Sequence, residues 1–311
     1  MKVKPWSLAA LVFCLAFSMF GGTAFGAPAR YAIVTEVVGN AVVTKAGGAL
    51  EIPVFTGMTL NEGDRLKVGK GGSLTLKIAD SEDEIVLGEN WQGTLSKLRE
   101  NDEGGTDTAI QTWAGSMYSH VQKLAGTDST FKVETPTAKA NVRGTHFIVT
   151  IDRFTGEVKI VVNAGIVNAG SDSPDDPGIP VLPSQQTSIY PWMNNWADLD
   201  YIDPEDLTVS VYAEVITKML KNKALIDEEN DELLNNLEEF DEENGLNLLE
   251  EEILARYKTN VENSLIHILR AAAQAGRLDE VTLQDIIETV NKTIEREERK
   301  YDLENEVPPI D

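Results

Sequence analysis

Few side chains in this 311-residue chain have the types and spacing that catalysis or metal binding requires. Its three histidines, His120, His146 and His267, are scattered and show no ligand spacing with one another. They also form no pattern with a nucleophile. The sequence contains no Gly-rich phosphate loop and no nucleotide-binding fingerprint. We therefore predict that the protein is not an enzyme and that it holds no metal and no cofactor.

Acidic residues in the second half of the chain allow one test for calcium. A calcium-loop frame runs from Asp227 to Glu238, with acids at positions 1, 3, 5 and 12. Position 6 is Glu232, where the frame needs glycine, so a solvated acidic helix is the favoured interpretation. The aspartates from Asp172 to Asp176 lie beside prolines and favour a solvated turn.

Tryptophans offer a second kind of binding site. Trp91 and Trp113 could form a sugar-binding platform, but buried or half-buried aromatic side chains are the more common outcome. The sequence thus assigns no ligand-binding residue.

The first 26 residues have the pattern of an export signal. Lys2 and Lys4 precede an apolar run, and small residues flank a cut after Gly26. An uncleaved anchor is the alternative, but a bilayer span needs about 20 apolar residues and this run is shorter. We expect an exported protein that is extracellular, at the cell surface or periplasmic, with no membrane span in the mature chain. Its only cysteine, Cys14, would leave with the signal, which excludes disulfides.

The formal net charge of −24 is concentrated in the second half. Residues 27–190 carry 14 basic and 20 acidic side chains, whereas residues 191–311 carry 11 and 31. Such acidity disfavours nucleic-acid binding, because phosphate would be repelled. It also disfavours adhesion to an anionic membrane surface. We expect an envelope protein or polysaccharide as the ligand instead.

The elements that must position any site differ between the two halves. Apolar and polar residues alternate in the first half, between Gly-, Asn- and Asp-rich breaks, which predicts short strands with one buried face. A sandwich, a barrel and a solenoid all remain open. Helical spacing begins near Asp203 and Pro204, which suit a helix start. Trp192 and Trp196 are expected to pack the two halves together. We predict a signal peptide (1–26), an all-β domain (27–190), a linker (191–202), an acidic α-helical domain (203–304) and a frayed tail (305–311).

The most specific pattern follows Thr130, where an extended segment and a proline precede a Val-Arg-Gly-Thr run. Its residues are Phe131, Val133, Thr135, Pro136, Val142, Arg143, Gly144, Thr145 and Phe147. This pattern resembles the FecR domain family of exported bacterial proteins. Weaker likenesses before and after it extend the resemblance over about residues 31–190.

Physical chemistry gives several of these motif residues structural roles. Pro136 cannot donate to a ladder and belongs at a strand start or edge. Gly144 suits a bulge or a close backbone approach. Arg143 could place its guanidinium on strand-end carbonyls. Thr135 and Thr145 could form hydrogen bonds across strands.

The resemblance implies a twisted, β-solenoid-like domain, here followed by the acidic α-helical C-terminal region. In the best-known members the domain is an extracytoplasmic sensor that relays iron-siderophore status to a sigma factor. Those members carry a cytoplasmic helical segment and a membrane span before the domain, where this chain has an export signal. We expect the fold to carry over better than the function.

Our leading prediction is an exported, non-catalytic binding or scaffold protein of the bacterial cell envelope. The alternative is an extracytoplasmic regulatory sensor of the iron-uptake type that acts through a membrane partner. A hydrolase is the third class, disfavoured because the sequence shows no nucleophile–base pair and no metal set.

Overall fold

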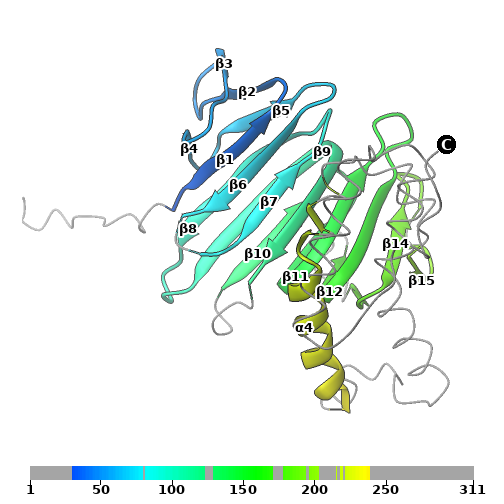
Figure 1. The fold of residues 1–311 in the computed structure, drawn as a ribbon. Coiled ribbons are helices and arrows are strands. Elements are labelled where there is room, and N and C mark those ends of the chain that lie inside the picture. Colours follow the sequence, from blue (N-terminus) through cyan, green and yellow to red (C-terminus); the bar gives the residue numbers. More distant parts are fainter. Residues whose placement is uncertain are drawn as a thin grey trace, which may run out of the picture.

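The computed structural model describes residues 30–79, 81–122, 129–170, 178–193, 196–202, 215, 218–219 and 221–238. Within these ranges the protein is mainly β, with one helix against the sheet (Figure 1). The predicted export signal, the aspartate loop at 172–176 and the helices expected beyond residue 238 lie outside the described residues. The elements are β1 (Ala32–Val38), β2 (Ala41–Thr44), β3 (Glu51–Pro53), β4 (Thr59–Leu60), β5 (Arg65–Val68), β6 (Ser73–Ile78), β7 (Glu84–Leu87), β8 (Gln92–Glu100), β9 (Thr106–Val121), β10 (Thr130–Glu134), β11 (Lys139–Ile151), β12 (Val158–Gly170), β13 (Ile179–Val181), β14 (Gln185–Ile189), β15 (Asp200–Tyr201) and α4 (Lys223–Asn235).

All of these strands belong to one 15-stranded sheet, which folds over into two layers. One layer has the order β4-β1-β6-β7-β9-β11-β12-β14-β15, and we call it the covered layer. The other has the order β3-β2-β5-β8-β9-β10-β11-β12-β13, and we call it the open layer. The long strands β9, β11 and β12 contribute one half to each layer, so the layers are continuous with each other.

Each strand or strand pair passes from one layer to the other at a residue with a left-handed backbone, and we call these points crossings. Glycine adopts a positive φ without steric cost, whereas other residues rarely do. Neighbouring crossings also touch: a Cβ on Gly165 would lie 2.1 Å from the carbonyl oxygen of Gly144. The crossing residues, one for each long strand or strand pair, are Gly39, Gly71, Asn90, Gly115, Gly144 and Gly165. We call this row the fold line.

Each crossing changes which side chains point inward. In β9, Ile110 lies in the core before the fold line and Met117 lies there after it, an odd number of residues later. In β11, Val142 before the fold line and Phe147 after it both lie in the core, and they are also an odd number of residues apart. Strict alternation would keep the two members of each pair on opposite faces. The fold line therefore reverses the phase of the strands and lets both layers aim apolar side chains at one core.

The solenoid-like arrangement that we expected is not confirmed. A β-solenoid stacks its repeats, and each repeat contacts only its neighbours. The described strands instead pair antiparallel, apart from β10 with β9, which are parallel. The domain is a folded antiparallel sheet in this part of the chain.

The outer face of the covered layer is buried over β9, β11 and β12, which corrects, for these strands, our expectation of strands with one buried face. Tyr118, Ile148 and Val161 point away from the core and are nonetheless fully buried. The described residues between 215 and 238, which include α4 and which we call the covering segment, lie over this face, and α4 packs against β12 (Figure 1). Strands buried on both faces carry nearly continuous apolar runs, as Phe147–Ile151 does.

The two linker tryptophans behave differently from each other. Trp196 is partly buried and packs against the β core, and its expected contact with the helical half stays a prediction. Trp192 is 71% exposed and stacks on Tyr190 with a centroid distance of 4.8 Å, so its expected packing role is wrong. The division into a β domain and a separate helical domain stays a prediction.

The fold line predicts a sharp difference between two glycine substitutions. Gly165 and Gly71 have nearly the same φ, 70° and 66°, but a Cβ on Gly71 would meet nothing within 4 Å. We expect Gly71→Ala to cost only the left-handed strain, about 1–2 kcal/mol. Gly165→Ala should cost roughly 1–3 kcal/mol more, because it forces two backbones apart. Urea unfolding of both variants measures this, and equal losses would contradict the proposed contact between crossings.

Candidate functional site

The FecR-type motif lies in β10, β11 and the turn between them. The side chains of Phe131, Val133, Val142 and Phe147 are buried in the core, and the two phenylalanine rings meet edge to face at 6.4 Å. These residues hold the two layers together and face no solvent.

The turn residues of the motif are also structural. Thr135 closes the hairpin, because its hydroxyl accepts from the Ala138 amide at 2.9 Å and its own amide donates to the Ala138 carbonyl. Pro136 is exposed in that turn, after the end of β10. Gly144 lies on the fold line, and Thr145 directly after it is buried. The side chain of Arg143 lies outside the described residues.

A different set of side chains meets on the outer face of the covered layer. Glu84, His120 and His146 stand directly opposite one another in a row across β7, β9 and β11. The two imidazole rings stack 4.1 Å apart and nearly parallel. The row exists because the phase reversal at the fold line turns His120 and His146 outward, whereas Met117 and Phe147 enter the core.

Residues behind His146 determine its orientation. The Tyr118 hydroxyl shares a 2.6 Å hydrogen bond with His146 Nδ1 and accepts a second, at 2.9 Å, from the Asn222 side-chain amide. Burial raises the pKa of the Tyr118 phenol well above its usual range, so this group keeps its proton. The Nε2 atom of His146 therefore points away from Tyr118, toward the covering helix.

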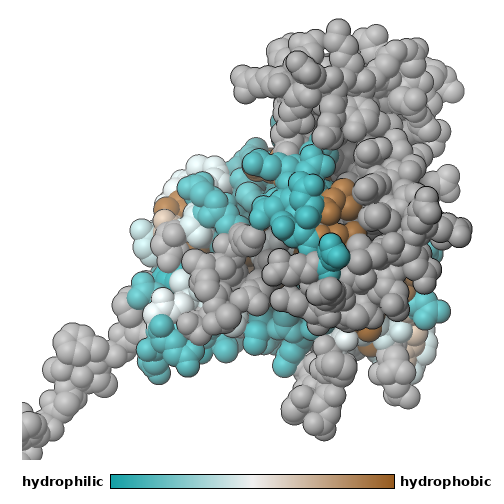
Figure 2. Space-filling model, turned by 90° about the horizontal axis from the view of Figure 1, so that it is seen from below, coloured by the Kyte–Doolittle hydropathy of each residue, from teal (hydrophilic) through white to brown (hydrophobic). Residues whose placement is uncertain are grey.

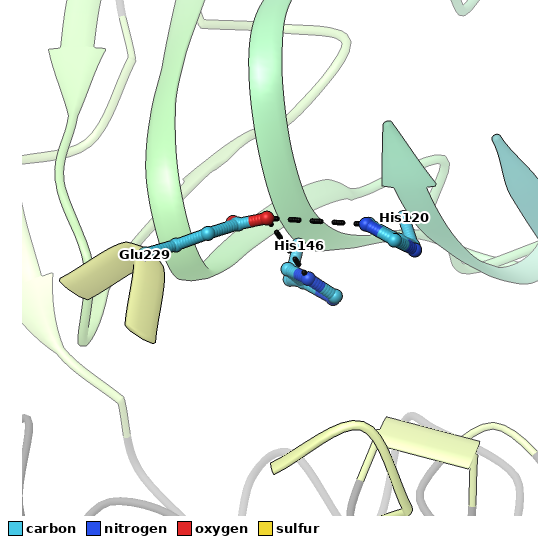
Figure 3. Close-up of side chains that lie close together, drawn as sticks. All are labelled: His120, His146 and Glu229. Carbon is cyan, nitrogen blue, oxygen red and sulfur yellow. Dashed lines mark ion pairs between the residues drawn. The ribbon is translucent and has the colours of Figure 1, made fainter. Parts of the chain in front are cut away.

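The covering segment provides a carboxylate at that position. Glu229 of α4 extends toward both rings, and its Oε1 lies 3.4 Å from His146 Nε2 and 3.9 Å from His120 Nε2 (Figure 3). The segment makes two further polar contacts with this face: Lys218 pairs with Glu84 at 2.9 Å, and Asn230 donates to the Asn163 carbonyl at 2.9 Å.

The sequence of the covering segment explains why these polar groups face the sheet. Most members of one stripe lie three, four or seven residues apart, which is the spacing of one helix face. Its apolar members are buried, and its polar members are those that bond to the sheet. The stripe comprises Val215, Met219, Asn222, Ile226, Glu229, Asn230 and Leu237.

The electrostatics of the cluster favour neutral imidazole at His120. Burial and the neighbouring His146 lower the pKa of His120 to about 4, against the opposing effect of the carboxylates of Glu229 and Glu82. His146 Nε2 and Glu229 Oε2 are both buried and make no hydrogen bond. Each of the three side chains thus offers one ligand atom, and these atoms lie within 4.8 Å of one another.

Our sequence reasoning missed this cluster. It treated the histidines as scattered, because 26 residues separate His120 from His146 in the chain, although β9 and β11 place them opposite each other. A signal was present in the helix, where Asn222, Glu229 and Asn230 interrupt an otherwise apolar stripe. Polar residues within an apolar stripe need polar partners when they are buried.

The structure also describes most of the calcium-loop frame and both candidate tryptophans. Residues 227–235 of the calcium-loop frame lie in α4 and are helical, as favoured, but the helix is not solvated on every side, because Asn230 is buried against the sheet. Trp91 is fully buried, so it cannot form a sugar-binding platform, whereas Trp113 is 41% exposed. No helix in the described ranges is both long and apolar enough to cross a bilayer.

Residues 64–168, from just before β5 to near the end of β12, match the family described as FecR protein. The FecR resemblance is confirmed for this segment. The FecR-like segment is about a third of the chain and contains both histidines, whereas Glu229 lies outside it.

Solved structures give only a distant likeness. Two crystal structures of a candidate anti-sigma factor from Parabacteroides distasonis align with 17% identity and a TM-score of 0.38. The alignment covers 46% of this chain and 62% of theirs, so the chain spans less than two thirds of that protein. No curated protein matches the chain.

Loss of one hydroxyl tests the bonding around His146. Tyr118→Phe leaves His146 Nδ1 and the Asn222 amide without their buried partner, so we expect a loss of about 1–3 kcal/mol in unfolding free energy. Tyr31→Phe, at a residue that is 42% exposed, should change it by less than about 0.5 kcal/mol. Chemical denaturation compares the two, and equal effects would count against the hydrogen bonds.

Protonation of His120 predicts a direction for the pH dependence of stability. Between its unfolded pKa near 6.5 and its folded value of about 4, the unfolded chain binds more protons than the folded chain. Stability should therefore fall as the pH is lowered through this range in chelator-treated buffer. His120→Gln should make the dependence shallower. Denaturation curves at several pH values, with an NMR titration of the ring, would measure both effects, and a His120 ring titrating near pH 6.5 would contradict the expectation.

Proposed function

We propose that the chain is an exported regulatory protein of the FecR type, which acts by binding a protein partner and not by catalysis. The observation that carries this proposal is the family match over residues 64–168, the segment that builds both sheet layers. The regulatory alternative from the sequence is better supported than a passive envelope scaffold, because the family's best-known members are sensors. Export, the membrane partner, and continuation of the acidic helical region beyond residue 238 are parts of this proposal.

The surface of the FecR-like domain supports protein binding at one place. Phe154, in the turn between β11 and β12, is 87% exposed, and Trp192 is 71% exposed. That turn lies close to the segment that carries Trp192, because a Cβ on Gly156 would meet the Pro191 ring. Exposed aromatic side chains are enriched among the anchors of protein interfaces. Figure 2 shows a mostly hydrophilic described surface on the side seen there, with hydrophobic residues in small groups.

Two experiments test the proposal in the native bacterium. Deletion of the gene should change the transcription of a defined set of genes, and the full-length chain should restore it. Crosslinking of the tagged full chain should recover a membrane or signalling protein. An unchanged transcript profile would overturn the regulatory proposal, and crosslinks to cell-wall polymer alone would favour the scaffold instead.

A surface variant makes the partner test specific. The double variant Phe154→Ala, Trp192→Ala should lower partner recovery by about tenfold or more, as expected when aromatic anchors are removed. Leu50→Ala provides the matched control, because Leu50 is 77% exposed on another loop. Equal recovery with the two variants would exclude this surface as the contact.

A further inference from the structure

We propose that His120, His146 and Glu229 bind one divalent transition-metal ion, for which Zn²⁺ is the best fit, and that this ion fastens α4 to the sheet. This proposal does not rest on the regulatory function. It replaces our sequence-based expectation that the chain has no metal site.

The donor atoms have spacings that a metal ion needs. Zn²⁺ binds imidazole nitrogen and carboxylate oxygen at about 2.0–2.2 Å, which places tetrahedral ligands roughly 3.4 Å apart. The distance from Glu229 Oε1 to His146 Nε2 is 3.4 Å, and that to His120 Nε2 is 3.9 Å. All three donors lie within 4.8 Å of one another. The two rings stack nearly parallel, so one imidazole must turn about its side-chain bonds before both Nε2 lone pairs point at the same ion.

Unpaired buried atoms form the second, independent observation. His146 is fully buried, yet its Nε2 has no hydrogen-bond partner, and Glu229 Oε2 is also buried without one. Buried polar atoms are nearly always bonded, so the unpaired Nε2 of His146, which lies 3.4 Å from Glu229 Oε1, points to a ligand at this position.

The partner behind His146 is of the kind that metal-binding histidines have. A ligating histidine usually donates its other ring N–H to an oxygen, which fixes the tautomer and the ring. The Tyr118 hydroxyl oxygen occupies that position at Nδ1, and Asn222 holds the hydroxyl in turn. A metal at Nε2 requires the tautomer with the proton on Nδ1, in which that N–H donates to the Tyr118 oxygen and the Nε2 lone pair points toward Glu229.

The ligand types select among metal ions. Two imidazoles with one carboxylate suit Zn²⁺ and related first-row ions, whereas Ca²⁺ and Mg²⁺ prefer oxygen ligands alone. Three protein ligands leave a fourth position for water or a group from a partner.

Metal binding would couple two parts of the chain. Both histidines lie in the FecR-like segment, and the carboxylate comes from the covering helix. An ion bound to all three ligands stabilises the docked helix, because the undocked state has only two of the ligands. Removal of the metal should therefore loosen α4 while the two-layered core stays folded.

The test uses the full chain without an affinity tag, treated with chelator and titrated with Zn²⁺ and, separately, with Co²⁺ as a spectroscopic probe. We expect one ion per chain, a Co²⁺ absorption spectrum with nitrogen ligands, and slower amide exchange in α4 with metal. Absence of stoichiometric binding by the unmodified chain would overturn the proposal.

Variants separate the site from adventitious binding. Glu229→Gln and His120→Gln should each weaken binding by at least the roughly 10–100-fold that loss of a supporting partner costs, and should abolish the exchange protection. Glu228→Gln, at the exposed neighbouring position, should bind as the unmodified chain does. Thermal unfolding in chelator verifies that the variants fold, and two ligand variants keep the test usable if one does not. Equal affinity in Glu229→Gln and Glu228→Gln would refute the site.

Discussion

Left-handed backbone along the fold line is the constraint on which the rest of this structure depends. A sheet that was not bent would expose one whole apolar face, whereas the bend brings both layers onto one core. Some neighbouring crossings also pass close to one another, as at Gly144 and Gly165, where the backbones leave no room for a side chain. The bend has a further consequence, since it reverses the alternation of β9 and β11. His120 and His146 point outward for that reason.

The outer face that results is neither an ordinary solvated surface nor an ordinary core. Apolar residues such as Ile148 and Val161 lie beside the two histidines and Tyr118. Only a segment with a mixed stripe can cover such a face, because every buried polar group needs a partner. Residues 215–238 have that stripe, and their ion pairs and amide hydrogen bonds match polar groups on the sheet. Helix and sheet are therefore matched in chemistry as well as in shape.

Much of the fold could be predicted from sequence because its signals are local. Alternation in Leu74–Ile78 and the Gly-rich breaks predict strands and turns, and the motif around Gly144 led to the FecR family. Strand pairing could not be predicted in the same way, since β9 pairs with β7, β8, β10 and β11 along different parts of its length. The choice between a solenoid and a folded sheet depends on those non-local pairings. Covering of the outer face was missed because it depends on a helix far along the chain.

The sequence by itself determined that the first half of the chain forms strands, where apolar residues alternate along them and where glycine permits a left-handed backbone. These follow from backbone sterics and side-chain polarity, which act within a few residues. Tertiary structure alone decided that His120, His146 and Glu229 meet. That meeting requires the register of β9 against β11, the phase reversal at the fold line and the docking of α4, and each of these is set by contacts between residues distant in sequence.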